Sequence, residues 1–271
     1  MSKMSKKIKA FYKENKKSTL IVYVTLRILV IVCMIGEILR KNWDNVFLCV
    51  LTLVLFIIPY IVDRKLKIKL PDTLEIIILL FIFSAEILGE IQNFYGIFSQ
   101  WDTMLHTLNG FLCAAIGFSL IDILNRDEKI HMKLSPKFVA VVAFCFSMTV
   151  GVLWEFFEFS GDRFLNTDMQ KDRIVIQIST VELNKEGKNV PVIVKNIDHT
   201  IIYSYDEQTN SYTETVIPNG YLDIGLIDTM KDLIVNFIGA VVFSIFGWLY
   251  IKNRDEHKFA ERFIPVVRND K

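Results

Sequence analysis

Six long apolar runs dominate the pattern of hydrophobic and polar positions along the chain. A helix needs roughly 20 residues to cross a hydrocarbon core of about 30 Å. The runs that approach this length occupy residues 20–39, 46–62, 74–91, 104–124, 138–159 and 233–251. The first run is long and lacks a small-residue cleavage site, so we expect a membrane span there and not a signal peptide. The pattern predicts an all-α membrane protein built as a six-helix transmembrane bundle.

The segment between the fifth and sixth runs has a different pattern. Residues 163–227 contain stretches in which β-branched residues alternate with polar ones, and turn-rich sequences separate these stretches. Such alternation is typical of short antiparallel strands joined by hairpins. The predicted strands cover residues 174–181, 190–194, 200–205 and 212–217. We therefore expect a small extracytoplasmic β-rich insertion, which either covers the mouth of the bundle or binds a partner.

Composition agrees with a membrane protein. Of the 271 residues, 52% are hydrophobic and 21 are phenylalanine, and the mean hydropathy is +0.37. This is too apolar for an ordinary soluble domain. The formal net charge of +1 gives no support for a nucleic-acid partner. The four cysteines fall in four different apolar runs, so we interpret them as small buried apolar residues and not as a disulfide frame or a zinc site.

The distribution of Lys and Arg predicts the orientation of the bundle, because cytoplasmic segments of membrane proteins are enriched in these residues. With the N-terminus inside, the cytoplasmic segments 1–18, 64–69, 126–137 and 252–271 hold 21 of the 31 basic residues. An even number of spans also places both tails on the same side. We expect cytoplasmic N- and C-termini in a multi-pass protein of the bacterial cytoplasmic (inner) membrane, with the lipid bilayer as a partner. The predicted segments are a basic cytoplasmic tail (1–18), transmembrane helices 1–5 (19–162), the insertion (163–227), transmembrane helix 6 (228–251) and a cytoplasmic tail (252–271).

Polar and ionisable residues gather at one end of several predicted spans. Asp102, His106 and Asn109 have the spacing i, i+4 and i+7, which places all three on one side of a helix. Ionisable groups inside a span are costly and therefore indicate function. The predicted topology brings these span ends to the outer leaflet, where they would form one site. Its other predicted members are Glu86, Glu90, Glu155, Glu158, Asp162, Asp228, Asp232 and Asn236.

This set of side chains suits a divalent cation. Many carboxylates in a low-dielectric site need a counter-charge, which retained protons, a bound cation, or pairs with Arg163, Lys231 and protonated His106 would supply. One imidazole among oxygen ligands favours Mg, Mn or Ca, and Zn stays open. A purely structural polar network is the competing interpretation, and Glu37, Glu90 and Asp223, taken singly, are expected to face water. We predict metal ligands at Asp102, His106, Asp162, Asp228 and Asp232, and acid–base roles at His106, Glu155 and Glu158.

The motifs that carry these residues resemble those of a known family. WDTMLHTLNG, GVLWEFFEFSGD, NTDMQ and DTMKDLIVNFIGA are similar to successive motifs of the YjdF-like bacterial integral membrane proteins. More distantly, the order Asp-x-x-x-His, Glu, Asp-x-x-x-Asn-x-x-Gly resembles that of VanZ-like membrane proteins. The resemblance implies the fold and the site but no reaction. The matching residues are Asp102, His106, Gly110, Trp154, Glu155, Glu158, Asp162, Gln170, Asp228, Asp232, Asn236 and Gly239.

Three functions stay open on this basis. The first is a metal-assisted or acid–base site for a lipid-linked or envelope-linked ligand. The second is a proton- or cation-coupled transporter, which needs a polar path to the cytoplasm. The inner halves of the spans offer little for such a path beyond Arg27, Glu75 and Asp122. The third is a non-catalytic envelope scaffold in which the β-rich insertion binds a partner.

Overall fold

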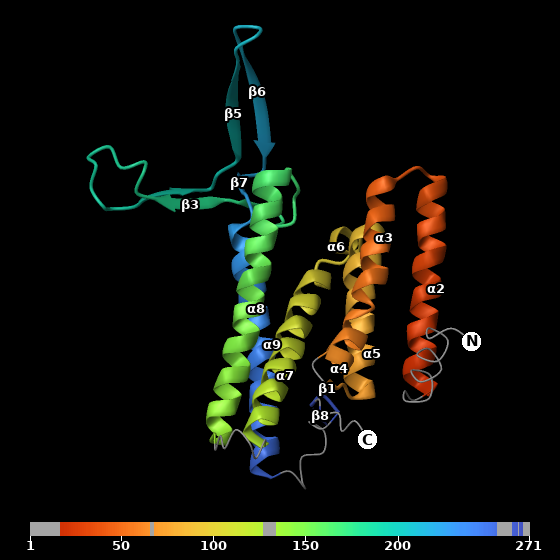
Figure 1. Cartoon of the computed structure of the whole chain (residues 1–271). Helices are drawn as coiled ribbons and strands as arrows, with labels where there is room; N and C mark the ends of the chain where they lie inside the picture. Colours follow the sequence, from red (N-terminus) through yellow and green to blue (C-terminus); the bar gives the residue numbers. More distant parts are fainter. Residues whose placement is uncertain (1–16, 66–67, 127–133, 254–261, 265, 268–271) are drawn as a thin grey trace. The chain divides into compact units, whose positions relative to one another are not determined.

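The structure is a computed structural model that describes residues 17–65, 68–126, 134–253, 262–264 and 266–267. Of the predicted basic tail, residues 1–16 lie outside the described residues. The chain forms two compact units. One comprises Met1–Val152 with Asp232–Lys271, and the other comprises Leu153–Lys231. The first unit is helical, and the strands β2 to β7 belong to the second (Figure 1).

The helices follow the apolar runs. Within the first unit, α2 packs against α3 and α5, and α5 packs against α7. Figure 1 shows α2 and α3 as an antiparallel pair joined by a short connection. The predicted mostly helical architecture is thereby confirmed. The helical elements are α2 (Lys17–Leu39), α3 (Trp43–Leu55), α4 (Ile58–Lys65), α5 (Asp72–Phe83), the π-helix η1 (Ser84–Ile91), α6 (Phe94–Ile97), α7 (Trp101–Arg126), α8 (Pro136–Leu165) and α9 (Leu226–Lys252).

Five helical stretches in the described part of the chain are long and apolar enough to cross a membrane. They are Lys17–Leu39, Trp43–Val62, Trp101–Asp122, Pro136–Phe164 and Leu226–Lys252. The remaining run, expected as the third span, is divided into α5 and the π-helix η1. This stretch carries Asp72 and Glu75 in its first turn and Glu86 and Glu90 in η1. The six-span count therefore stays a prediction.

The connection between α2 and α3 is fixed by a buried carboxylate. Glu37 is only 4% exposed. Its carboxylate accepts hydrogen bonds from the Arg40 guanidinium at 3.1 Å and from the Asn45 side-chain amide at 3.0 Å. The expectation that Glu37 faces water is wrong, because these two donors replace the water it loses on burial. Glu90 is exposed, as expected, and the half-buried Asp223 accepts a hydrogen bond from the Ile227 amide at the start of α9.

Helices α7, α8 and α9 approach one another closely at small residues. A Cβ on Gly110 of α7 would collide with the backbone carbonyl of Asn236 on α9, and a Cβ on Gly239 would collide with the carbonyl of Thr107. Ser147 of α8 donates a hydrogen bond of 2.7 Å to the Gly110 carbonyl. Small residues permit this approach between membrane helices, and polar groups join them. These contacts fix the register of α7 against α9.

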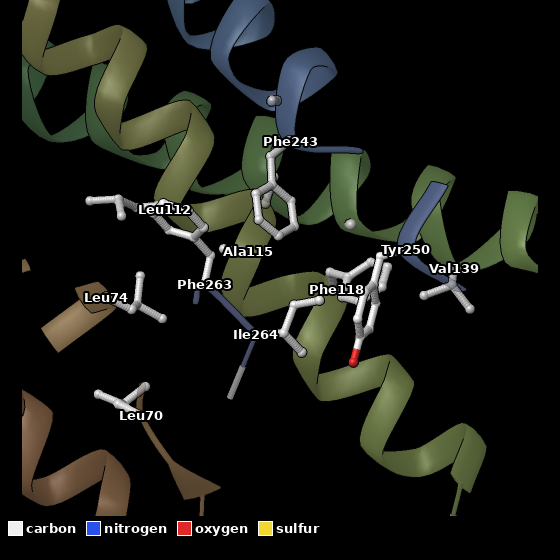
Figure 2. Close-up of a cluster of buried hydrophobic side chains, with 13 residues drawn as sticks. Leu70, Leu74, Leu112, Ala115, Phe118, Val139, Phe243, Tyr250, Phe263 and Ile264 are labelled. Carbon is white, nitrogen blue, oxygen red and sulfur yellow. The ribbon is translucent and has the colours of Figure 1, made fainter. Parts of the chain in front are cut away.

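A cluster of buried hydrophobic side chains lies beyond this contact, and Figure 2 shows Phe118, Phe243 and Phe263 among them. The Phe111 ring packs edge-on against Phe243, with ring centroids 5.0 Å apart, and against Phe263, with centroids 5.2 Å apart. Phe118 packs edge-on against Phe243 at 5.9 Å. Such pairs add favourable quadrupole interactions to the burial of large apolar rings.

The C-terminal segment takes part in this core. Phe263 and Ile264 are buried within the cluster. Strand β8 (Val266–Val267) pairs antiparallel with β1 (Ile68–Lys69), which lies between α4 and α5. The C-terminal segment therefore packs against the bundle at these residues. The sequence predicted only a cytoplasmic tail here and did not indicate these contacts. The pairing also places Val266–Val267 beside Ile68–Lys69, just before α5 begins.

The second unit contains the predicted strands. Its strands are β2 (Arg173–Val175), β3 (Gln177–Thr180), β4 (Val192–Lys195), β5 (His199–Asp206), β6 (Ser211–Pro218) and β7 (Tyr221–Asp223). They form three two-stranded antiparallel sheets, β2 with β7, β3 with β4 and β5 with β6. The short antiparallel strands predicted from the alternation are confirmed. The first predicted strand is divided at Ile176, and β7 is additional.

Replacing Gly239 by Ala should lower the stability of the bundle. The new methyl group would meet a backbone carbonyl, which cannot rotate away, so α7 and α9 must separate. Overpacking of this kind costs about 1–3 kcal/mol. We expect a clearly lower midpoint of thermal unfolding for the full chain in detergent. Gly36→Ala is the matched control because a Cβ there meets nothing within 4 Å. Equal midpoints for the two variants would contradict the close approach.

Candidate functional site

Three of the predicted site residues converge at one end of α7 and α9. Asp102 and His106 lie one turn apart on α7, and the His106 Nε2 atom is 3.3 Å from an Asp102 carboxylate oxygen. Asp232 reaches the same place from α9. One potential ligand atom from each residue lies within 4.8 Å of the other two. Residues 130 positions apart in the sequence are thus brought together by the packing of two helices.

The three side chains differ in their access to solvent. Asp232 is 1% exposed, whereas the side chains of His106 and Asp102 are 11% and 24% exposed. Two carboxylates this close repel each other when both are ionised, and a nearby positive charge relieves the repulsion. Protonated His106 or a bound cation could provide that charge. The arrangement is open on the Asp102 side and closed around Asp232.

A layer of amides lies one turn further along both helices. The Asn109 side-chain amide donates a hydrogen bond of 3.1 Å to the Asn236 side-chain oxygen. The Asn236 amide in turn contacts the Met148 sulfur of α8 at 3.7 Å, and the Cys113 thiol donates to Asn109 at 3.4 Å. Since Asn236 is 1% exposed, its paired amide fixes the rotation of α9. The same rotation directs Asp232, one turn earlier, toward α7.

Glu155 and Glu158 lie in the second unit. Both are buried, at 4% and 8% exposure, on helix α8. The Glu158 carboxylate accepts a hydrogen bond of 2.7 Å from the Trp154 indole, one turn earlier on the same helix. Trp154 and Glu158 therefore form an i, i+4 pair. The predicted acid–base roles of Glu155 and Glu158 stay predictions.

Asp162 and Asp228 hold the connection that follows α8. One Asp162 oxygen accepts hydrogen bonds from the Thr167 hydroxyl at 2.8 Å and the Met169 amide at 2.6 Å, and the other accepts the Gln170 amide at 2.8 Å. The Asp228 oxygens accept the Lys171 amide at 2.9 Å and the Arg173 guanidinium at 3.1 Å. Both carboxylates thus accept hydrogen bonds from backbone amides. The predicted role of Asp162 and Asp228 as metal ligands is a different one, and it stays a prediction.

Two partners in this network were not predicted as site residues. Arg173 forms a salt bridge with the buried Asp228. The Gln170 side-chain amide donates a hydrogen bond to the Thr229 hydroxyl and so links the connection to α9. The motif NTDMQ contains Gln170, so the resemblance marked its position although not its contact. Arg173 lies after this motif, and no sequence pattern indicated its contact with Asp228.

Glu86 and Glu90 lie on the π-helix η1 (Ser84–Ile91). The Trp101 indole donates a hydrogen bond of 3.3 Å to the Ser84 carbonyl and so connects the start of α7 to the start of η1. π-helical turns are rare and are frequent at functional sites. Among the described residues, the compact group of potential metal ligands contains Asp102, His106 and Asp232 and neither of these glutamates. Their predicted membership of the site stays a prediction.

Helices that are long and apolar enough to span a bilayer are typical of an integral membrane protein. The chain belongs to the family described as "Predicted membrane protein (DUF2238)", which matches residues 20–253. It is also 25% identical over 107 residues to an uncharacterized protein of Thermotoga maritima. That match covers 40% of this chain and about half, 53%, of the relative. No solved structure matches the chain.

The family agrees with part of the resemblance seen in the motifs. Similarity to YjdF-like proteins is consistent with it. Similarity to VanZ-like proteins is not shown by these matches. Because the family description specifies no reaction, the function has to be argued from the geometry of the site.

Removing the Asp162 carboxylate should loosen the connection after α8. Asp162→Ala leaves the amides of Met169 and Gln170 without their acceptor, and a hydrogen bond to a charged group contributes about 1.5–3 kcal/mol. We expect faster hydrogen exchange over residues 166–173, measured by mass spectrometry. Asp168→Ala is the matched control, because that side chain is 65% exposed and pairs with Lys171 at 3.8 Å. Equal exchange in both variants would exclude this role.

Proposed function

We propose that the protein binds a divalent cation at Asp102, His106 and Asp232 and uses it on a lipid-linked or envelope-linked ligand. The observation that carries this proposal is the convergence of three potential ligand atoms from α7 and α9 within 4.8 Å of one another. Mg, Mn, Ca and Zn all bind carboxylates, and among these four the imidazole most favours Zn. Three protein ligands also leave positions open for water or a substrate oxygen, as in catalytic metal sites.

The separations between the ligand atoms bear on which cation would fit. Calcium binds oxygen at 2.3–2.6 Å, so ligands on opposite sides of the ion lie up to about 5 Å apart. Two carboxylate oxygens separated by up to 4.8 Å can therefore both bind calcium, which favours oxygen over imidazole. Magnesium and zinc, with bonds of about 2.0–2.1 Å to oxygen and nitrogen, need ligand atoms roughly 3–4 Å apart. The His106 Nε2 atom and the Asp102 oxygen already have such a separation, 3.3 Å.

The cation would supply Lewis-acid activation of a phosphate or carbonyl oxygen. Among the protein's own residues, Asp232 would stay fixed because it is buried, and Asp102 would face the entry because it is the most exposed of the three. Glu155 and Glu158 are proposed as acid–base groups on the strength of their burial. The enzyme class is left open.

A binding site at one end of α7 and α9 is favoured over a transport path. Beyond the Asn109–Asn236 pair, helices α7 and α9 come into close contact at Gly110 and Gly239. The Phe111, Phe243 and Phe263 rings then fill the bundle. A conducted ion would have to pass the Phe111, Phe243 and Phe263 rings, which carry no ligand oxygen, before it reached the buried oxygens of Ser119, Asp122 and Ser244 further along α7 and α9. The proton- or cation-coupled transporter is therefore the weaker proposal.

We further propose six spans with both termini cytoplasmic and the β-rich unit outside, in a bacterial cytoplasmic membrane. The sixth span would be α5 with η1, whose combined length is 20 residues. That length is sufficient to cross a bilayer. The pairing of β1 with β8 supports a common side for the basic 64–69 connection and the C-terminal segment.

Metal analysis of the purified full chain tests the proposed site. After treatment with a chelator and dialysis against Ca²⁺, Mn²⁺, Mg²⁺ or Zn²⁺, we expect about one ion per chain for at least one metal. Asp232→Asn and His106→Gln should each weaken binding by at least about tenfold, since even the outer partners of metal ligands contribute 10- to 100-fold.

Asp44→Asn is the control for loss of negative charge, because Asp44 is an exposed acid in the first turn of α3. It should leave the affinity and the stoichiometry unchanged. If no metal binds stoichiometrically, or if Asp44→Asn has the same effect as Asp232→Asn, the proposed metal site is wrong.

A further inference from the structure

The β5–β6 hairpin presents two chemically different faces. The register pairs Ile201 with Val216, Tyr203 with Glu214, and Tyr205 with Tyr212. Side chains of directly paired residues lie on the same face of a sheet, and alternate residues along a strand share that face. These six residues therefore form one face, which is aromatic and apolar around a single carboxylate and which ends in the pair His199 and Pro218. The opposite face carries Thr and Ser at most positions, together with Ile202, Ile217 and Asp206.

The aromatic face is exposed. Tyr203, Tyr205 and Tyr212 are 60%, 52% and 70% exposed, and Ile201 and Val216 are 40% and 56% exposed. Among the described residues, β5 and β6 pair only with each other, so both outer edges of this sheet lack a neighbouring strand. An isolated two-stranded hairpin is marginally stable in water. A contiguous exposed apolar patch on such an element indicates an interaction surface.

The centre of this face is a block of three tyrosines and one glutamate. Tyr205 and Tyr212 face each other with ring centroids 5.1 Å apart at an angle of 52°. The Tyr205 hydroxyl donates a hydrogen bond of 2.5 Å to the Asn210 side chain in the turn, which fixes that ring. Tyr203 and Glu214 form the adjacent pair. Aromatic faces attract cations, and a neighbouring carboxylate adds a charge-assisted contact.

The charge of the hairpin also favours a cationic partner. Residues 199–218 contain Asp206, Glu207 and Glu214 and no Lys or Arg, and the ring of their one histidine, His199, lies 2.9 Å from the Asp198 carboxylate. Hydrogen bonds from the Gln208 amide and from the Thr209 hydroxyl and amide hold the pKa of Asp206 below its ordinary value, so this carboxyl stays ionised. The hairpin would repel an anionic lipid surface and attract a cationic partner.

We propose that this hairpin docks a basic, extended segment of another protein, with a Lys or Arg side chain against Tyr203, Tyr205 and Tyr212 and beside Glu214. The unpaired strand edges favour a peptide over a small amine, because an extended segment can add main-chain hydrogen bonds along β5 or β6. The inference goes beyond the proposed function, since no residue of the Asp102–His106–Asp232 group takes part. The proposed metal site and the proposed docking surface can therefore be tested, and can fail, independently of each other.

Fluorescence anisotropy with the full chain in lipid nanodiscs tests this surface. The probe is a labelled ten-residue peptide in which Lys and Thr alternate. A second peptide with Gln in place of Lys is its control. We expect saturable binding of the Lys peptide that weakens with salt, and binding of the Gln peptide at least about tenfold weaker.

Matched variants locate the site on the hairpin. Tyr212→Ala should reduce affinity roughly tenfold, whereas Tyr212→Phe keeps the aromatic face and should retain binding. Glu214→Gln should weaken binding more than Glu207→Gln, which removes the same charge at the turn. Thr213→Ala, on the opposite face, should have no effect.

The proposal is overturned if the Lys and Gln peptides bind equally or not at all. Equal effects of Glu214→Gln and Glu207→Gln would also overturn it, because they would indicate diffuse attraction. Displacement of the Lys peptide by phosphatidylcholine vesicles would replace the proposed protein partner by a membrane surface. Loss of binding in Tyr212→Phe together with Tyr212→Ala would exclude the aromatic contact.

Discussion

The close approach of α7 and α9 is the contact on which the rest of the site depends. Gly110 faces the Asn236 carbonyl and Gly239 faces the Thr107 carbonyl, so each helix presents a glycine to the backbone of the other. In a bilayer, lipid tails are as apolar as side chains, and helices associate through such tight packing and through hydrogen bonds between them. Once the register is fixed there, Asp232 and Asn236 can only lie beside the polar stripe of α7.

The bundle is consequently layered along α7 and α9. An acidic and imidazole layer is followed by a pair of asparagines, then by the glycine contact and an aromatic layer that includes the C-terminal Phe263. Each layer restricts the next, because buried amides need their partners and aromatic rings fill the remaining space. The result is a polar site in which Asp102 is the most exposed member and Asp232 the most buried. The second unit uses its carboxylates differently, since Asp162 and Asp228 satisfy amides of the connection after α8.

Much of this was predictable from local patterns, and the remainder depends on tertiary contacts. Apolar runs predicted the long helices, alternation predicted the hairpins, and the i, i+4 spacing predicted that Asp102 and His106 meet. The proximity of Asp232 to them required a topology argument, because no local signal joins residues so far apart. Spacing could not reveal that Glu37 is buried with Arg40 and Asn45, nor that Asp162 binds amides of a connection. The burial of Phe263 and the π-helical turn carrying Glu86 likewise arise from packing that the local pattern does not encode.

The most direct test of this account is disulfide crosslinking of α7 to α9 at the asparagine layer. In a chain whose four native cysteines are replaced by serine, Asn109→Cys with Asn236→Cys should form a disulfide on mild oxidation, because these side chains are hydrogen-bonded at 3.1 Å. After proteolytic cleavage within residues 163–227, the two fragments should then migrate together until a reductant is added. Asn109→Cys with Ile238→Cys is the control, since Ile238 is 49% exposed on α9. Fragments that separate for the first pair, or crosslink equally well for both pairs, would contradict the packing from which the site is built.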